Sequence, residues 1–140
     1  MVNELELDAT LENLKPVNDF IKSIVKEYKC SRRDELSLKM AIEEIYINIV
    51  NYAYAPNIGK VKINSEINQN KFSIVLKFID EGKPFNPLEQ ADPDFNLDAE
   101  DRQAGGFGIF IIKDKVDDIS YEYKDGKNIL TVKKNLTKEI

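Results

Sequence analysis

The chain has 140 residues with 25 acidic and 20 basic side chains, a net charge of −5, one cysteine and no histidine. This length predicts one compact domain, residues 1–140, with a single core. Because the chain has no histidine, it can carry neither a phosphoacceptor histidine nor a Ser-His-Asp triad. The lone Cys30 excludes an internal disulfide. The sequence lacks a basic stripe with interleaved aromatic residues, so we do not expect nucleic acid as a direct partner.

The beginning of the chain and its apolar runs bear on location. Residues 1–6 are polar and lack the basic and apolar regions of a signal peptide. No apolar run approaches the ~20 residues that cross a bilayer. We therefore expect a cytoplasmic protein that does not insert into membranes.

The N-terminal part predicts a strand and a helix. Residues 4–7 alternate Glu-Leu-Glu-Leu, as a half-buried strand does, and Thr10 offers a side-chain oxygen where the chain turns. Pro16 suits the first turn of a helix whose apolar residues recur at helical spacing up to Cys30.

A second, longer helix follows. Ser31 is the expected N-cap, and the helix runs from about 32 to 54, because Pro56 cannot continue it. Two strands come next, over 61–67 and 72–79, and their polar link has hairpin composition.

The C-terminal part predicts a long loop, a helix and a hairpin. Residues 81–104 show no clear periodicity, and their length favours a functional lid over a plain connector. An apolar helix is expected over 107–116, and strands over 119–123 and 129–133 pair around an Asp-Gly turn. This order predicts an α+β two-layer sandwich, in which three helices cover one face of an about five-stranded, largely antiparallel sheet.

A narrow polar stripe interrupts the apolar surface of the second helix. Glu44, Asn48 and Asn51 fall within an arc of about 60° at ~100° per residue. A buried amide without a partner costs on the order of 1–3 kcal/mol, so these groups need internal partners or a ligand. We interpret the stripe as one wall of a ligand cavity.

The stripe carries side chains suited to phosphoryl transfer. The neutral amide oxygen of Asn48 suits Mg²⁺, and Glu44, one turn earlier, is placed to take a proton from a hydroxyl or a water. The alternatives are an Asn that bonds the backbone and a Glu on the helix surface. Neighbouring Glu43 lies about 100° round the helix and is expected to be solvated or paired.

Two other segments suggest contacts to a nucleotide. Asp80 ends a strand and can accept a hydrogen bond from an amino group such as that of adenine, while Gly82 lets the base lie flat against the backbone. Glycine-rich helix starts bind phosphate through free N–H groups and the helix dipole, and such a start is formed by Gly105, Gly106, Phe107 and Gly108. Plain turns are the alternative in both cases.

The predicted lid is acidic. Arg102 is its only basic residue between Lys83 and Lys113. We expect Arg102 to turn inward toward a γ-phosphate, with a local Arg-Asp pair as the alternative.

Taken together, these segments resemble the GHKL (Bergerat-fold) ATPases and, within them, the RsbW-like anti-sigma-factor serine/threonine kinases, over nearly the whole chain. Residues 44–48 resemble the N box, 80–85 the adenine box and 105–110 the glycine box. Residues 116–121 and 126–131 resemble the kinase subgroup.

The resemblance implies ATP and Mg²⁺ as cofactors, with Glu44 as general base and Asn48 as the metal ligand. Asn51 stands where relatives often have His, and Lys127 where a Thr often follows the last glycine. The expected catalytic residues are Glu44 and Arg102. The expected nucleotide contacts are Asn48, Asn51, Asp80, Gly82, Gly105, Gly106, Phe107 and Gly108.

The function implied by the resemblance is an ATP-dependent serine/threonine-protein kinase of the partner-switching type. Such a kinase phosphorylates a STAS-domain anti-anti-sigma protein and sequesters a sigma factor, and the resemblance also implies a homodimer. Two alternatives remain open: a slow ATPase switch, and a catalytically silent protein-binding module of the same fold.

Overall fold

The computed structural model describes residues 2–89 and 108–139, which form a two-layer α+β sandwich. The strands are β1 (Val2–Asp8), β2 (Lys60–Asn68), β3 (Ser73–Asp80), β4 (Asp118–Lys124) and β5 (Lys127–Asn135). They form one sheet in the order β1-β2-β3-β5-β4, and every neighbouring pair is antiparallel.

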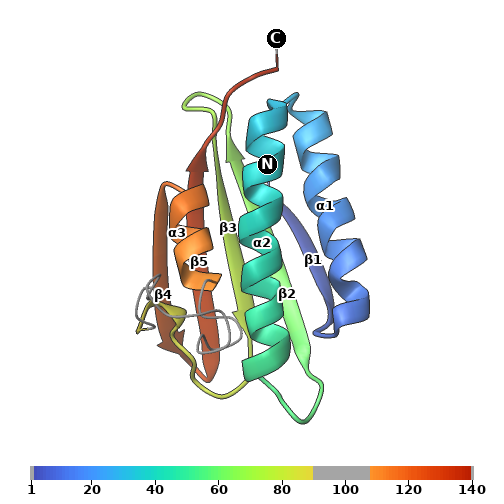
Figure 1. Ribbon diagram of the computed structural model, residues 1–140, viewed down its shortest axis with the longest axis vertical. Coiled ribbons are helices and arrows are strands. Elements are labelled where there is room, and N and C mark those ends of the chain that lie inside the picture. Colours follow the sequence, from blue (N-terminus) through green and yellow to red (C-terminus); the bar gives the residue numbers. More distant parts are fainter. Residues whose placement is uncertain (1, 90–107, 140) are drawn as a thin grey trace, which may run out of the picture.

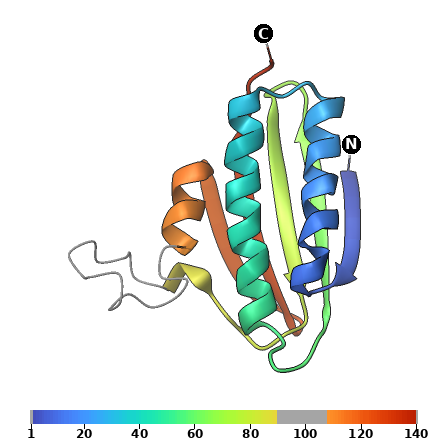
Figure 2. The same cartoon turned by 45° about the vertical axis from the view of Figure 1, so that its right-hand side comes forward.

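One face of the sheet carries the helices, which are α1 (Leu14–Glu27), α2 (Arg32–Tyr52) and α3 (Gly108–Lys115). Figures 1 and 2 show α2 between α1 and α3, over the middle of the sheet. Short 3-10 turns occur at η1 (Leu11–Asn13) and η2 (Pro87–Glu89). The predicted fold class is confirmed. Within the described residues no helix is both long and apolar enough to cross a membrane.

The core lies where the apolar side of α2 packs against the sheet. Ile42, Ile45 and Tyr46 on α2 are at most 1% exposed, as are Ile63 on β2 and Phe78 on β3. The strands alternate accordingly, with their apolar side chains toward the helices. The burial of α2 therefore determines which polar residues of this helix reach the interior.

The predicted cap of the second helix is confirmed, whereas the predicted role of Thr10 is wrong. The Ser31 side chain accepts a hydrogen bond from the Asp34 N–H. The Thr10 side chain makes no capping hydrogen bond to η1. Instead, the buried Tyr46 hydroxyl donates to the Thr10 carbonyl at 2.6 Å and accepts from its N–H at 3.0 Å, so the tertiary contact satisfies the backbone of this turn.

The Asp-Gly turn between β4 and β5 is confirmed as well. Asp125 and Gly126 both have positive φ, 54° and 77°, as a two-residue type I′ hairpin requires. This turn fixes the register of β5 against β4. On its other edge β5 pairs with β3, and the register of that pair places Asn128 of β5 directly opposite Asp80 of β3.

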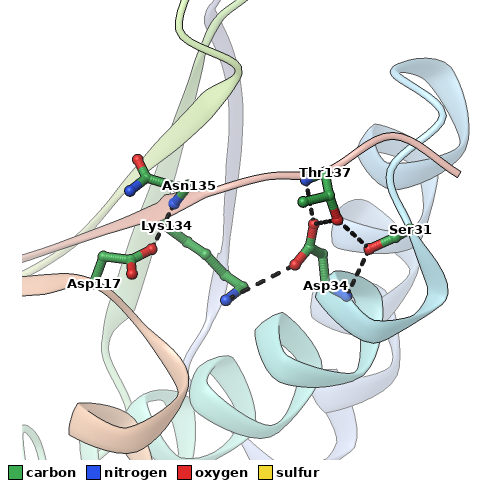
Figure 3. Close-up of polar contacts among 6 residues, drawn as sticks. All are labelled: Ser31, Asp34, Asp117, Lys134, Asn135 and Thr137. Atoms are coloured by element: carbon green, nitrogen blue, oxygen red, sulfur yellow. Dashed lines mark hydrogen bonds and ion pairs between the residues drawn. The ribbon is translucent and has the colours of Figure 1, made fainter.

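A polar cluster fastens the end of the chain to the beginning of α2 (Figure 3). The Asp34 carboxylate is buried and accepts hydrogen bonds from the Thr137 N–H and, at 2.9 Å, from the Thr137 hydroxyl. The Thr137 hydroxyl also lies 2.8 Å from the Ser31 hydroxyl, and the Lys134 ammonium lies 3.9 Å from Asp34. The cluster satisfies a buried carboxylate and ties residues more than 100 positions apart in the sequence.

This cluster predicts a stability loss far from the candidate site. We expect Asp34→Ala to lower the free energy of unfolding by about 1–3 kcal/mol, because it leaves the Thr137 N–H and hydroxyl without their acceptor. Urea denaturation followed by circular dichroism measures the loss. Asp19→Ala, which removes only an exposed ion pair to Lys15, is the control and should leave the midpoint nearly unchanged. Equal midpoints for both variants would contradict this account.

Candidate functional site

A small cavity lies between α2 and the ends of β3 and β5 and has a volume of about 30 Å³. Most of its wall comes from α2 and the sheet, and Phe85 and Pro87 close it from the segment after β3. Its polar lining consists of Asn48, Asp80, Tyr121 and Asn128. The cavity therefore combines an apolar wall with a few polar groups, as ligand sites do.

Asn48 brings an unsatisfied polar group to this cavity. The residue is 8% exposed, and its Nδ2 has no hydrogen-bond partner within the described part of the chain. An amide in this state costs free energy unless a ligand completes its contacts. An N–H donor in the cavity is therefore available to a ligand, and the predicted role of Asn48 as a metal ligand stays a prediction.

Glu44 lies one turn before Asn48, and both side chains converge on the first residue of α3. A Cβ built on Gly108 would lie 3.2 Å from Glu44 Oε2 and 3.7 Å from Asn48 Nδ2. Burial and, to a lesser extent, the charge of Glu43 raise the pKa of Glu44. The start of α3 thus has a carboxylate and an amide beside a backbone without a side chain.

Asp80 stands at the other polar end of the cavity, where β3 ends. Its Oδ1 accepts hydrogen bonds from the Gly82 N–H at 2.9 Å and from Asn128 Nδ2 at 2.8 Å. Burial raises the pKa of the Asp80 carboxyl, and these two hydrogen bonds counteract part of that rise. The carboxylate is 5% exposed and oriented by its neighbours.

Asn128 was not among the residues predicted for the site. The signal was its place in the strand: Asn128, Leu130 and Val132 alternate toward the helices, so a polar residue occupies the first inward position of β5. Its direct opposition to Asp80 follows from the register and was not visible in the motif spacing.

Gly82 has a packing role that differs from the predicted one. A Cβ at this position would overlap the Ala53 carbonyl oxygen at the end of α2, and the next residue, Lys83, donates its N–H to the same oxygen at 2.9 Å. The Tyr54 hydroxyl also accepts from the Glu81 N–H at 2.7 Å. The absence of a side chain at Gly82 thus lets the segment after β3 lie directly against α2.

Other predicted residues have different placements. Glu43 accepts a hydrogen bond from Asn18 at 3.1 Å, which confirms that it is paired. Phe85 stacks on Tyr52 with 4.9 Å between ring centroids. Asn51 is exposed and is not part of the cavity lining, and its nucleotide contact stays a prediction.

Part of the predicted site lies outside the described residues. This part comprises Arg102, Gly105, Gly106 and Phe107, and of the predicted lid only residues 81–89 are described. Gly108 is described as the first residue of α3.

The donor set at the Glu44 end suits one kind of metal. In residues 2–89 and 108–139, no three Cys, Asp or Glu side chains come together as a protein-only metal cage. Mg²⁺ does not need one, because it commonly takes one or two protein oxygens and completes its shell with phosphates and water. Among the described residues, Asn48 would hold the ion through its Oδ1; the atom without a hydrogen-bond partner is Nδ2 of the same amide, an N–H donor that does not ligate a metal.

The sheet, the helices on one of its faces and the site beside α2 define the class of histidine kinase-like ATPase domains. The family model of this domain matches residues 7–134, and the chain belongs to this family. This membership confirms the resemblance to the GHKL ATPases.

Named relatives cover most of the chain. The serine/threonine-protein kinase BtrW of Bordetella bronchiseptica is 26% identical over 128 residues, which are 91% of this chain and 89% of BtrW. The serine-protein kinase RsbW of Staphylococcus aureus is 26% identical over 144 residues, covering 97% of this chain and 87% of RsbW. A crystal structure of RsbU and RsbW domains from Mycobacterium tuberculosis matches with a TM-score of 0.70 at 16% identity, and supports the fold. The match covers all of this chain but only 34% of that longer one.

The close approach at Gly82 predicts a strong effect of one added methyl group. We expect Gly82→Ala to lower the free energy of unfolding by about 2 kcal/mol or more, because backbone atoms of Ala53 must move. Thermal denaturation measures the loss. The control is Gly108→Ala, whose Cβ would meet only the flexible end of Glu44 and ordinary contacts, and which should stay near the wild type. If Gly82→Ala is as stable as this control, Gly82 is not needed for packing.

Proposed function

We propose that this chain is an ATP-dependent serine/threonine-protein kinase that acts as an anti-sigma factor by partner switching and phosphorylates a STAS-domain anti-anti-sigma protein. The observation that carries the proposal is the convergence of Glu44 and Asn48 on the start of α3, at the side of a cavity that Asp80 also lines. This arrangement separates a base-binding end from a phosphate end.

At the base end, Asp80 supplies specificity. Its buried carboxylate is an acceptor at the end of a strand, and an adenine amino group is a matching donor. A buried acceptor that meets a base without this amino group stays unsatisfied, so the site favours adenine over guanine. Gly82 allows the adjoining backbone to stay close to α2.

At the phosphate end, Asn48 would hold Mg²⁺, and the start of α3 would face the phosphates with the positive end of its dipole. The bound metal supplies charge neutralisation of the phosphates. Glu44 acts as the general base that takes the proton of the attacking serine or threonine hydroxyl. Its raised pKa brings it closer to the operating pH, which favours this task.

Admission of a base requires a change in the lining. A cavity of about 30 Å³ has room for a water molecule and not for a purine ring. Among the residues that the structure describes, Phe85 and Pro87 are the lining residues outside the sheet and outside α2 and its end. We assign them the movement that opens the cavity.

The names of the relatives support the kinase assignment. BtrW and RsbW are named serine/threonine- and serine-protein kinases, and the likeness extends over more than 90% of this chain. The proposal also includes several features that stay predictions. These are the single domain over 1–140, the lid at 81–104, the contacts of Arg102 and of residues 105–107, a homodimer, a sigma-factor partner and a cytoplasmic location.

Two other functions fit parts of the site. A slow ATPase switch would use the same Glu44 on a water. A silent binding module would leave the placement of Glu44 and the unpartnered Asn48 Nδ2 beside the start of α3 without a purpose, since an unused buried amide only lowers stability. The kinase proposal accounts for both residues.

A phosphotransfer assay separates these functions. The chain is mixed with Mg²⁺, γ-labelled ATP and a panel of STAS-domain proteins, and label is followed on protein and as free phosphate. Label on a serine or threonine of one STAS protein is the expected result. Free phosphate alone identifies an ATPase, and ATP that stays intact refutes both enzymatic functions.

The general base is tested by one isosteric change. We expect Glu44→Gln to keep Mg·ATP affinity within about threefold and to lower the phosphotransfer rate by about 10²–10⁴-fold, because Gln has the shape of Glu but cannot accept the proton. Calorimetry and the labelling assay measure the two quantities. Glu35→Gln in the first turn of the same helix is the control and should retain the rate. Full activity of Glu44→Gln would remove Glu44 as the base.

The proposed contact between Asp80 and the adenine ring is tested by Asp80→Asn, which should raise stability and weaken ATP binding. The pKa of Asp80 is raised, so the native state holds its proton more strongly than the unfolded chain and stability falls as the pH rises above the ordinary value of 3.8. At pH 7, Asp80→Asn should therefore raise Tm by about 2–4 °C and flatten this pH dependence.

The same variant should weaken ATP binding more than tenfold, because an amide donor then replaces an acceptor facing the adenine amino group. Differential scanning fluorimetry and calorimetry measure the two effects. The exposed Asp118→Asn on β4 is the control. Unchanged ATP affinity of Asp80→Asn would refute the base contact.

A further inference from the structure

Asn128 is the most connected polar side chain of the cavity, and the proposed function has not used it. It is 5% exposed. Its Nδ2 donates to Asp80 Oδ1 at 2.8 Å and to the Lys83 carbonyl at 2.9 Å, and lies 3.4 Å from the Gly82 carbonyl. Its Oδ1 accepts from the Phe85 N–H at 3.1 Å and from the Tyr121 hydroxyl.

These contacts fix the orientation of the amide. Both N–H groups of Nδ2 and two acceptor positions of Oδ1 are in use, which is the full capacity of an Asn side chain. A flipped amide would place N–H groups against the Phe85 N–H and an oxygen against the Asp80 carboxylate. Asn128 can therefore keep its hydrogen bonds in one orientation only.

The contacts also decide how Asp80 presents its carboxylate. Both donors to Asp80, the Gly82 N–H and Asn128 Nδ2, bind the same oxygen, Oδ1. This leaves Oδ2 as the oxygen through which the carboxylate receives a further donor. A carboxylate held in this way cannot turn its bonded edge to a ligand without losing two buried hydrogen bonds.

Asn128 holds the segment after β3 as well. It binds the carbonyl of Lys83 and the N–H of Phe85, the two positions that lead into the part of the lining contributed by Phe85 and Pro87. The Asn128 side chain therefore binds both the Asp80 carboxylate, which contacts the base in the proposed function, and the backbone that leads into the cavity lining.

On the basis of the proposed ATP site, we propose that Asn128 is a positioning residue that sets base selectivity, by fixing the edge that Asp80 offers and the backbone of residues 82–85. Guanine carries a carbonyl oxygen where adenine carries the amino group, so a carboxylate held in place repels guanine and accepts from adenine. When the carboxylate can turn, both effects weaken. Loss of Asn128 therefore reduces discrimination between the bases in addition to lowering affinity.

The test measures Mg·ATP and Mg·GTP affinity of the full chain and of Asn128→Ala by calorimetry. The wild type should prefer ATP, and in Asn128→Ala the ATP-to-GTP affinity ratio should fall about tenfold, the equivalent of one hydrogen bond to a charged group. Asn128→Asp, which places a second carboxylate beside Asp80, should lower the ratio at least as far. Asn135→Asp makes the same chemical change at an exposed position of β5 and should keep the ratio.

A second measurement does not depend on nucleotide. In the nucleotide-free protein, amide hydrogen exchange of Phe85 should become at least tenfold faster in Asn128→Ala, because its acceptor is gone. A ratio that stays constant while both affinities fall equally would reduce Asn128 to a purely structural residue and overturn the inference. Unchanged exchange at Phe85 would do the same. A wild type that binds neither nucleotide would instead refute the proposed function.

Discussion

The burial of α2 against the middle of the sheet is the constraint on which the rest of the structure depends. Ile42, Ile45 and Tyr46 of α2 belong to the hydrophobic core and are at most 1% exposed to solvent. Because a helix presents residues four apart on one side, this burial also carries Asn48 inward and leaves Glu44 half-buried beside α3. The site is therefore a consequence of how the core is filled.

The polar groups of the site oppose the stability of the fold. Asn48 keeps an unsatisfied nitrogen, and burial makes ionisation of Glu44 and Asp80 less favourable. The Asp34 carboxylate shows the contrasting case, since it is about as buried as Asp80 but has the Thr137 N–H and hydroxyl as donors and Lys134 nearby. The buried carboxylate of Asp34 is thus satisfied within the chain, whereas Asn48 Nδ2 in the cavity lacks a partner. Among the described residues, Asn18 Oδ1 and Asn64 Oδ1, which lie outside the cavity, also lack one.

Position in the sheet explains why the sequence interpretation found Asp80 and overlooked Asn128. Asp80 ends an apolar strand and is followed by a glycine, a local pattern that is visible along the chain. Asn128 has no such local mark, because its importance comes from pairing across 48 positions. The same limit applies to Thr10, whose side chain suited a cap but whose backbone is satisfied by Tyr46 of a distant helix.

The sequence by itself determined the elements, the fold class and the family resemblance, because the spacing of apolar residues, Ser31 as a cap and the Asp125-Gly126 turn act over a few residues. Only the tertiary structure decided which polar side chains share a cavity. It exposed Asn51, turned Asn48 inward, and placed Asn128 between Asp80 and residues 82–85. The physical reason is that strand pairing and the packing of α2 bring together residues that are far apart in the chain. No local sequence pattern marks such contacts.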